Sequence, residues 1–142
     1  MCLNQGLGTM VWSPLGWGRL TGKMRRGLTA KDGRIKGGAV GGPEVDDEYL
    51  YDVVDERAKV SAELDPSIPQ VALAWVLSRP SISTVVKGAR NSEQLASNIA
   101  AAELKLSDEY IARLDKVSHR TPIYPYWHQR DFDDRNPKPT QW

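Results

Sequence analysis

The 142-residue sequence contains one cysteine, Cys2, and only two histidines. A single cysteine excludes an intrachain disulfide and a zinc site built from several thiolates, and it is typical of a reducing compartment such as the cytoplasm. No apolar run reaches the ~20 residues of a membrane-spanning helix, and the first residues lack the charged and apolar regions of a signal peptide. These absences predict a soluble, cytoplasmic protein.

An excess of charge of either sign is also missing, because 19 lysines and arginines face 18 aspartates and glutamates. This balance provides no broad attraction to nucleic acid or to an anionic membrane, so any anionic ligand must be recognised by a local cluster. The length suits one ordinary domain and falls well short of the ~250 residues of an eight-stranded β/α barrel. We therefore expect a small ligand.

Short apolar segments at 9–12 and 83–87 predict two buried strands. Apolar residues at helical spacing predict four helices. They run from Asp46 or Asp47 to about Leu64, from Ser67 to a point before Pro80, from Asn91 to about Ala102, and from Ser107 to about Ser118. Leu95, Ile99 and Ala102 are predicted to form the inner face of the third helix. The glycine-rich segment 29–43 shows no apolar period and is predicted to be an irregular flap.

The order strand, helices, strand, helices predicts an α/β fold with parallel strands and right-handed crossovers. Parallel sheets are buried on both faces and need several neighbouring strands, so two strands do not make an independent sheet. The first residues, "MCLNQGLG", read as the end of a helix followed by its glycine stop. We expect the sequence to begin partway through a larger fold.

The stretch "SPLGWGRLTGKMRRG", residues 13–27, follows the first strand with four glycines, one lysine and three arginines. A Walker phosphate loop has four residues between its first glycine and its Gly-Lys pair, whereas only three separate Gly18 from Gly22. Met24 also stands where that loop needs a serine or threonine, so the stretch does not match it. It also departs by one residue from the G-x-G-x-x-G dinucleotide fingerprint. The loop is therefore an anion-binding candidate of another type.

A second anion-binding candidate is "KGARNSEQLASN", where the second strand ends at Gly88 and a helix begins near Asn91. Backbone N–H groups at a helix start, together with the guanidinium of Arg90, suit a phosphate. Gln94 and Asn98 lie one turn apart and are placed to hydrogen-bond a purine ring. The alternative is that Arg90 and Asn98 are ordinary solvated surface residues.

Taken together, these motifs resemble the C-terminal part of the aldo-keto reductase superfamily. The matching segments are "VWSPLGWGRLTGK", "QVALAW", "VVKGARNSEQLASNIAA" and "LSDEYIARLD", and they cover nearly the whole chain up to Ser118. The resemblance implies the C-terminal fragment of a TIM-type (β/α)8 barrel, with two parallel strands, the seventh and eighth, and several helices. It divides the chain into a barrel portion, 1–118, and an aromatic C-terminal tail, 119–142.

The resemblance also implies an extended NADP molecule held at the ends of the two strands. It places Trp12, Ser13, Pro14, Leu15, Gly16 and Trp17 along the nicotinamide and pyrophosphate, with Lys23 neutralising phosphate charge. Gly88 and Arg90 would lie at the 2′-phosphate, and Gln94, Ser97 and Asn98 around the ribose and adenine. Arg90 favours NADP over NAD, because its guanidinium has little to pair with when the 2′-phosphate is absent.

In this family the nicotinamide hydride reduces a carbonyl while a tyrosine donates a proton, aided by an aspartate, a lysine and usually a histidine. All four come from earlier strands and loops, so we assign no catalytic residue and expect a fragment that is not competent alone. The alternative is a non-catalytic β/α fragment that self-associates or docks on another chain through exposed strand edges. The sequence leaves substrate and oligomeric state open.

The tail at 119–142 concentrates aromatic residues and prolines. It is either a lid over a substrate pocket, as in the resembled family, or a segment packed on the outside of the barrel. His119 and His128 match no tight metal-binding spacing, so we predict no metal site. Aspartates at 131, 133 and 134 nearly cancel the nearby arginines, which argues against single-stranded nucleic acid as a ligand.

Overall fold

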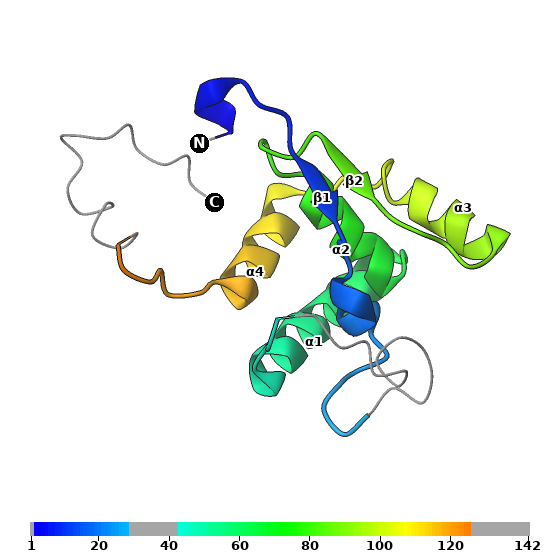
Figure 1. The fold of residues 1–142 in the computed structure, drawn as a ribbon. Coiled ribbons are helices and arrows are strands. Elements are labelled where there is room, and N and C mark those ends of the chain that lie inside the picture. The colour runs from blue at the N-terminus through cyan, green and yellow to red at the C-terminus, as the bar shows by residue number, and fades with distance from the viewer. Residues whose placement is uncertain (1, 29–42, 126–142) are drawn as a thin grey trace.

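The computed structural model describes residues 2–28 and 43–125 of the chain (Figure 1). The elements in chain order are the short 3-10 helix η1 (Leu3–Gln5), strand β1 (Met10–Trp12), the 3-10 helix η2 (Gly16–Thr21), α1 (Asp47–Leu64), α2 (Ile68–Leu77), strand β2 (Thr84–Val86), α3 (Ser92–Ala100) and α4 (Asp108–Ser118). The predicted flap, apart from Pro43, and the tail beyond Pro125 lie outside the described residues.

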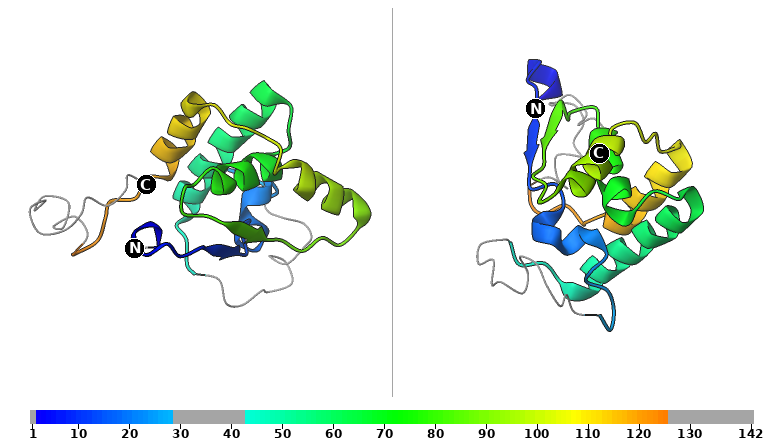
Figure 2. Two further views of the ribbon diagram at one scale, coloured as in Figure 1. Left: turned by 90° about the horizontal axis from the view of Figure 1, so that it is seen from above. Right: turned by 90° about the vertical axis from the view of Figure 1, so that its right-hand side faces the viewer.

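The two strands form a parallel sheet, as the sequence predicted, but the prediction that they are buried was wrong. In each strand the first and last residues are exposed and only the middle residue, Val11 or Val85, is partly buried. Met10 pairs with Thr84 and Trp12 with Val86, and the backbone carbonyl of Thr9 accepts hydrogen bonds from the N–H groups of Ser83 and Thr84 at 3.0 and 3.1 Å. Both views of Figure 2 place the strands on one side of the molecule and α1, α2 and α4 on the other. The helices therefore cover one face of the sheet.

The helices begin at the predicted capping residues. The Asp46 carboxylate accepts a hydrogen bond from the N–H of Tyr49 at 2.8 Å, at the start of α1. At the start of α2, the Gln70 side-chain oxygen accepts from the N–H of Ser67 at 2.8 Å. These bonds occupy backbone donors that have no partner within the helix. The local sequence therefore set the starts of α1 and α2.

Among the described residues, two apolar clusters of the core lie on either side of α2. Near the sheet, Leu15, Ala72, Leu73 and Ala101 are buried, with Leu20 and Val85 packed against them. Farther out, Val60 of α1, Val71 of α2 and Leu114 of α4 are buried together. Because α2 contributes to both clusters, it joins the sheet to the outer helices.

The predicted inner face of α3 was wrong. Leu95 and Ile99 are 49% and 61% exposed, and Ala102 is exposed as well. The residue that ties this region to the core is Ala101, which is 1% exposed. The apolar spacing correctly predicted a helix, but no described segment covers the face on which Leu95 and Ile99 lie.

The buried face of α1 includes a charged residue that the apolar pattern did not single out. Arg57 is only 4% exposed, and its Nε and Nη1 atoms have no hydrogen-bond partner. Its Cζ lies 5.8 Å from the centre of the Trp75 ring. Burial lowers the pKa of this guanidinium to about 10. Arg57 is therefore a charge that the folded chain accommodates at a cost.

Arg57→Met is expected to stabilise the chain. Methionine retains a long unbranched side chain that can fill the same space, and it removes the buried charge. The free energy of unfolding, measured by urea denaturation, should rise by about 1–3 kcal/mol at pH 7. Arg113→Met is the control, since Arg113 pairs with Glu56 and Glu63 at 2.8 and 2.7 Å and its loss should be neutral or destabilising. A lower unfolding midpoint for Arg57→Met would contradict this account.

A polar network joins the end of α2 to α4. The Asp115 carboxylate accepts a hydrogen bond from Nε1 of Trp75 at 2.8 Å and forms an ion pair with Arg79, whose Nη1 donates at 3.0 Å. The Arg79 Cζ also lies 4.1 Å from the Trp75 ring centre. Burial acts to raise the pKa of Asp115, but the hydrogen bonds from Arg79 and Trp75 outweigh it and lower the pKa.

Asp115→Asn is therefore expected to destabilise the chain in a pH-dependent manner. A carboxyl whose folded pKa is lowered contributes stability above its unfolded pKa of about 3.9 and loses it as pH falls through the folded value. The loss should be about 1–2 kcal/mol at pH 7, since the carboxylate is partly exposed, and should shrink below about pH 4. Urea denaturation across this pH range measures it, with the exposed Glu103→Gln as control; a pH-independent difference would refute it.

Candidate functional site

The two predicted anion-binding loops leave the sheet at the same end. Because β1 and β2 are parallel and Trp12 pairs with Val86, the segments that begin at Ser13 and Lys87 start next to each other. Figure 1 shows η2 and the start of α3 beyond these strand ends. The sheet thus brings together segments that are far apart in sequence. The residues joined by the Thr9–Ser83 hydrogen bond, for example, are 74 positions apart.

The first loop has an unusual backbone. Ser13 and Trp17 have φ values of +53° and +59°, although neither is a glycine, and Gly18 has φ +97°. The N–H groups of Gly16 and Gly18 donate to the carbonyls of Ser13 and Leu15 at 2.9 and 3.0 Å. Left-handed residues other than glycine cost ~1 kcal/mol or more and concentrate at functional sites. The clustering of such residues here marks the loop as a site candidate.

The predicted cofactor residues of this loop divide into buried and accessible ones. Pro14 and Leu15 are buried, and Leu15 packs in the core cluster beside α2, so its side chain anchors the loop. Trp12 is 71% exposed, and its ring meets that of Trp17 edge to face at 5.5 Å. Trp12 and Trp17 therefore form an aromatic wall at the end of β1.

The arginines of the first loop do not act together as an anion site. Arg25 and Arg26 bind carboxylates of α1: Arg25 pairs with Asp55 at 3.1 Å, and Arg26 pairs with Glu48 at 2.7 Å. Hydrogen bonds that Arg26 donates to the carboxylates of Glu48 and Asp52 raise its pKa further above the ordinary value. The charged residues that the sequence grouped together thus fasten the loop to α1, while Lys23 is exposed.

Two further contacts hold the first loop in place. Arg19 donates from Nη1 to the carbonyl of Pro43 at 2.9 Å, and the Thr21 hydroxyl donates to the carbonyl of Gly18 at 2.6 Å. Gly22 has φ +81°, and an added Cβ there would lie 2.6 Å from Cδ1 of Ile68 in α2. The loop is therefore held against α1 and α2, which limits its movement.

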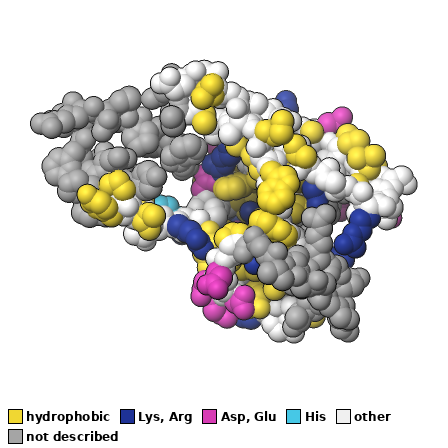
Figure 3. Space-filling model, viewed as in Figure 1, with side chains coloured by type: hydrophobic (Ala, Val, Ile, Leu, Met, Phe, Trp, Pro, Cys, Tyr) yellow, Lys and Arg dark blue, Asp and Glu magenta, His cyan; other side chains and the backbone are white. Residues whose placement is uncertain are grey.

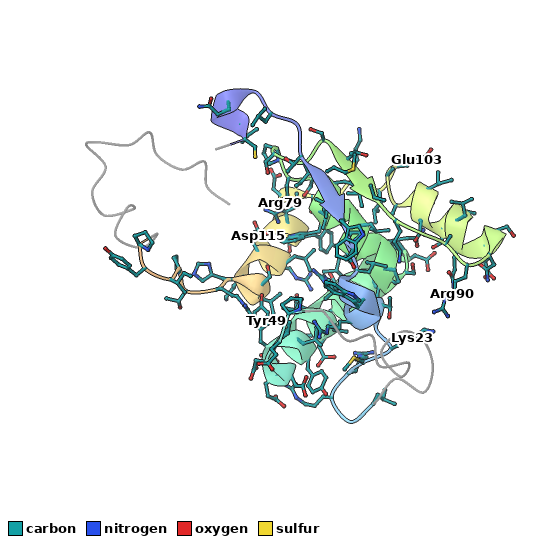
Figure 4. The ribbon with its side chains drawn as sticks, in the orientation of Figure 1. Lys23, Tyr49, Arg79, Arg90, Glu103 and Asp115 are labelled. Atoms are coloured by element: carbon teal, nitrogen blue, oxygen red, sulfur yellow. The ribbon has the colours of Figure 1, made fainter. Side chains whose placement is uncertain are left out.

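The second loop presents an accessible arginine at the start of a helix. Gly88 and Arg90 are exposed, and Arg90 takes part in none of the ion pairs of the described residues. Figure 4 shows Arg90 and Lys23 on the same side of that view, away from Arg79 and Asp115. Two exposed cations thus follow the same end of the sheet.

Gln94 shapes this second loop. Its side-chain oxygen accepts from the N–H of Arg90 at 3.1 Å, while its own N–H donates to the Asn91 side chain at 2.8 Å. Asn91, the predicted capping residue, is confirmed at the start of α3, and the Gln94 side chain bonds the N–H of Arg90 just outside the helix. Gln94 therefore orients the backbone that carries Arg90.

Ser97 and Asn98, the remaining predicted residues, are half-buried on α3. The Ser97 carbonyl accepts a hydrogen bond from Nε2 of Gln70 at 3.1 Å, which ties α3 to α2. No group of three histidine, cysteine, aspartate or glutamate residues within the described part of the chain is arranged to hold a metal ion. Of the helices described, none is both long and apolar enough to cross a membrane.

The donors present fit an extended, negatively charged dinucleotide. The first loop offers an exposed lysine and an aromatic wall. The second offers Arg90 beside the start of α3, where the N–H of Gln94 already donates to Asn91 and those of Ser92 and Glu93 have no acceptor within the helix. An added Cβ on Gly88 would meet no atom within 4 Å, so a ligand can approach the backbone there. These groups suit phosphates separated along one ligand.

The sequence also matches a known protein family. The model of the Aldo/keto reductase family matches residues 1–119. A Schizosaccharomyces pombe protein described as a voltage-gated potassium channel β subunit is 33% identical over 83% of this chain and 36% of its own length. The L-glyceraldehyde 3-phosphate reductase of Escherichia coli O157:H7 is 31% identical over 80% of this chain and 34% of its own.

Solved structures support the same fold. The glycerol dehydrogenase of Gluconobacter oxydans is similar over 87% of this chain and 38% of its own, with a TM-score of 0.63 and 22% sequence identity. The chain thus spans about a third of the length of the relatives that it matches. Its two parallel strands and helices correspond to a fragment of their TIM barrel. The chain belongs to the aldo/keto reductase family.

Proposed function

We propose that this chain forms the NADP-binding portion of an aldo-keto reductase. The observation that supports this most directly is the parallel pairing of β1 and β2, which starts both anion-binding loops at one edge of the sheet. Active sites of TIM barrels lie at the C-terminal ends of the strands, and phosphate groups are commonly held after the last two. The single cysteine favours a cytoplasmic location for the protein.

In this proposal the two loops bind different parts of the dinucleotide. The segment from Trp12 to Trp17 lies along the nicotinamide and pyrophosphate, and Lys23 neutralises phosphate charge. Arg90 pairs with the 2′-phosphate beside Gly88, where the guanidinium can make two charge-assisted hydrogen bonds. Gln94 holds the Arg90 backbone in place, and Ser97 and Asn98 border the adenosine.

The reaction of the complete protein would be reduction of an aldehyde or ketone by hydride from the nicotinamide. The proton donor and its assisting residues come from barrel strands that precede β1 in this family, so this portion binds and orients the cofactor without completing the chemistry. General acid catalysis needs the donor within hydrogen-bond reach of the substrate oxygen. The isolated chain should therefore bind cofactor with little turnover.

Arg90→Ala tests the cofactor assignment. Removing the guanidinium should weaken NADPH binding by about tenfold or more and NADH binding by less than about twofold, because only NADPH carries the 2′-phosphate. Both affinities are measured by titrating the fluorescence of the reduced nicotinamide. Testing both forms is essential because one relative, from Escherichia coli K12, is named an NADH-specific methylglyoxal reductase.

The control for this test is Arg120→Ala, which removes an exposed arginine beyond the end of α4. Arg120 lies over the ring of Tyr49 at 4.5 Å, outside both loops, so its loss should leave both affinities unchanged. Equal weakening of NADPH and NADH by Arg90→Ala would count against the 2′-phosphate site. Absence of saturable binding to the unmodified chain would refute the proposed function.

Gly18→Ala tests whether the backbone of the first loop is required. An added Cβ at Gly18 would meet no atom within 4 Å, so the substitution acts only through the strained φ of +97°. We expect NADPH affinity to fall about fivefold or more, since a left-handed alanine costs ~1–2 kcal/mol. Gly6→Ala, at φ +64° and equally open, is the matched control outside the loops. Equal NADPH affinity of the two variants would contradict the assignment.

A second candidate function is a non-catalytic module that docks through its sheet. The exposed Met10 and Trp12 and the unpaired strand edges of the described chain favour it. Such a module would show concentration-dependent association without a response to NADPH. Combined sizing and cofactor titration of the purified chain separates the two functions.

A further inference from the structure

Lys23 lies between two anchored points of the first loop. Before it, the backbone of Gly22 approaches α2 so closely that an added Cβ would lie 2.6 Å from Cδ1 of Ile68. After it, Arg25 and Leu28 close a turn, in which the N–H of Leu28 donates to the carbonyl of Arg25 at 2.8 Å and the N–H of Arg25 donates to the carbonyl of Leu28 at 3.1 Å. The exposed Lys23 is therefore carried by a short segment that is fixed on both sides.

Acidic side chains of α1 hold the second of these anchored points. Arg25 pairs with Asp55 at 3.1 Å, and Arg26 pairs with Glu48 at 2.7 Å, with Asp52 at 3.0 Å and with Asp55 at 3.6 Å. The i, i+4, i+7 spacing of the three carboxylates places them on one face of the helix. In Figure 3, acidic side chains gather at the lower edge of the viewed face, over the start of α1. We call Glu48, Asp52 and Asp55 the acidic row.

The acidic row would be unfavourable beside an anionic cofactor if it acted by charge alone, because carboxylates repel phosphates. Its pairing with two arginines offsets that repulsion and fixes the position of the loop. A cation that is already ordered before binding has less conformational entropy to lose when the ligand arrives. Negatively charged residues can therefore raise the affinity for an anion when they act through the position of a cation.

We propose that the acidic row of α1 positions Lys23 for the cofactor, acting through Arg25 and Arg26. The proposal rests on the proposed function, in which Lys23 neutralises the charge of phosphates that NADPH and NADH share. The acidic row therefore raises the affinity for both forms, whereas Arg90 distinguishes them by the 2′-phosphate. Its members are positioning residues, because they act through the loop and not by contact with the cofactor.

The double variant Glu48→Gln/Asp52→Asn tests this proposal. Both side chains are exposed, at 70% and 59%, so the variant removes two ion pairs of Arg26 and leaves every cation of the loop in place. Affinities for NADPH and NADH, titrated by fluorescence at low salt, should fall alike by about threefold or more, the scale expected for two exposed ion pairs. Removing two negative charges would by itself strengthen anion binding, so a fall in affinity separates positioning from general electrostatics.

The matched control is Glu44→Gln/Asp47→Asn, which removes the same charge at the same end of α1. Both residues are exposed, and neither takes part in the ion pairs found within the described residues. This variant should weaken the binding of neither cofactor. Circular dichroism checks that both double variants keep their helices.

Two further measurements link the effect to the loop and to Lys23. Hydrogen exchange of the amides of residues 23–28, which needs no cofactor, should be faster in Glu48→Gln/Asp52→Asn than in the control variant. In a Lys23→Ala background the same double substitution should change neither affinity, because the residue through which it acts is gone.

The positioning role would be overturned by equal exchange in the two double variants, by a rise in affinity, by a fall that the control shares, or by an undiminished fall in the Lys23→Ala background. Saturable binding to the unmodified chain that Glu48→Gln/Asp52→Asn leaves unchanged would refute the positioning role alone. Absence of binding to the unmodified chain would refute the proposed function as well. The two failures are thus distinguishable.

Discussion

The parallel pairing of β1 with β2 is the constraint on which the rest of the structure depends. It joins segments separated by 74 residues, as in the Thr9–Ser83 hydrogen bond, and starts the two candidate anion-binding loops at one edge. The same pairing places Val85 beside Leu15 against the core residues of α2. Without it, the two loops would belong to different parts of the surface and could not share a ligand.

The ion pairs that arginines form within the chain decide which of these cations remain accessible to a ligand. Arg25 and Arg26 bind acidic residues of α1, and Arg79 binds Asp115 in the network around Trp75. Their charges hold loops and helices together, whereas Arg57 is buried without a hydrogen-bond partner for two of its nitrogens. Arg90 is exposed beside a helix start. Similar side chains thus serve different purposes because their surroundings differ.

The exposed face of the sheet and the match to the aldo/keto reductase family both indicate that the chain corresponds to part of a barrel. The chain matches about a third of its relatives' length, and the sheet formed by its described residues has two strands, whereas the relatives' fold is a closed barrel. A barrel removes free edges and covers the inner face of each strand. The exposed Met10 and Trp12 are therefore the residues that a barrel interior would contain.

Local residue patterns were sufficient to predict the helices, the strands and the family. Local patterns predicted both strands and all four longer helices, because a capping residue such as Asp46 and an apolar period act within a few residues of one another. The motifs on the two loops indicate the family without knowledge of their geometry, and the place of Arg90 after Gly88 marks it as a phosphate-binding candidate. The predicted strand ends were one residue too long at most, as expected for local signals.

The contacts of individual side chains, in contrast, could not be predicted from local patterns, because they depend on how the helices and strands pack. In the folded chain Leu15 and Arg57 are buried, whereas Leu95 and Ile99 are exposed. Arg25 and Arg26 pair with carboxylates of α1 instead of remaining available to a ligand. These outcomes depend on residues that are distant in sequence and meet only after folding. Burial and ion pairing arise from contacts between such distant residues, so no local pattern of residues encodes which surfaces will be covered.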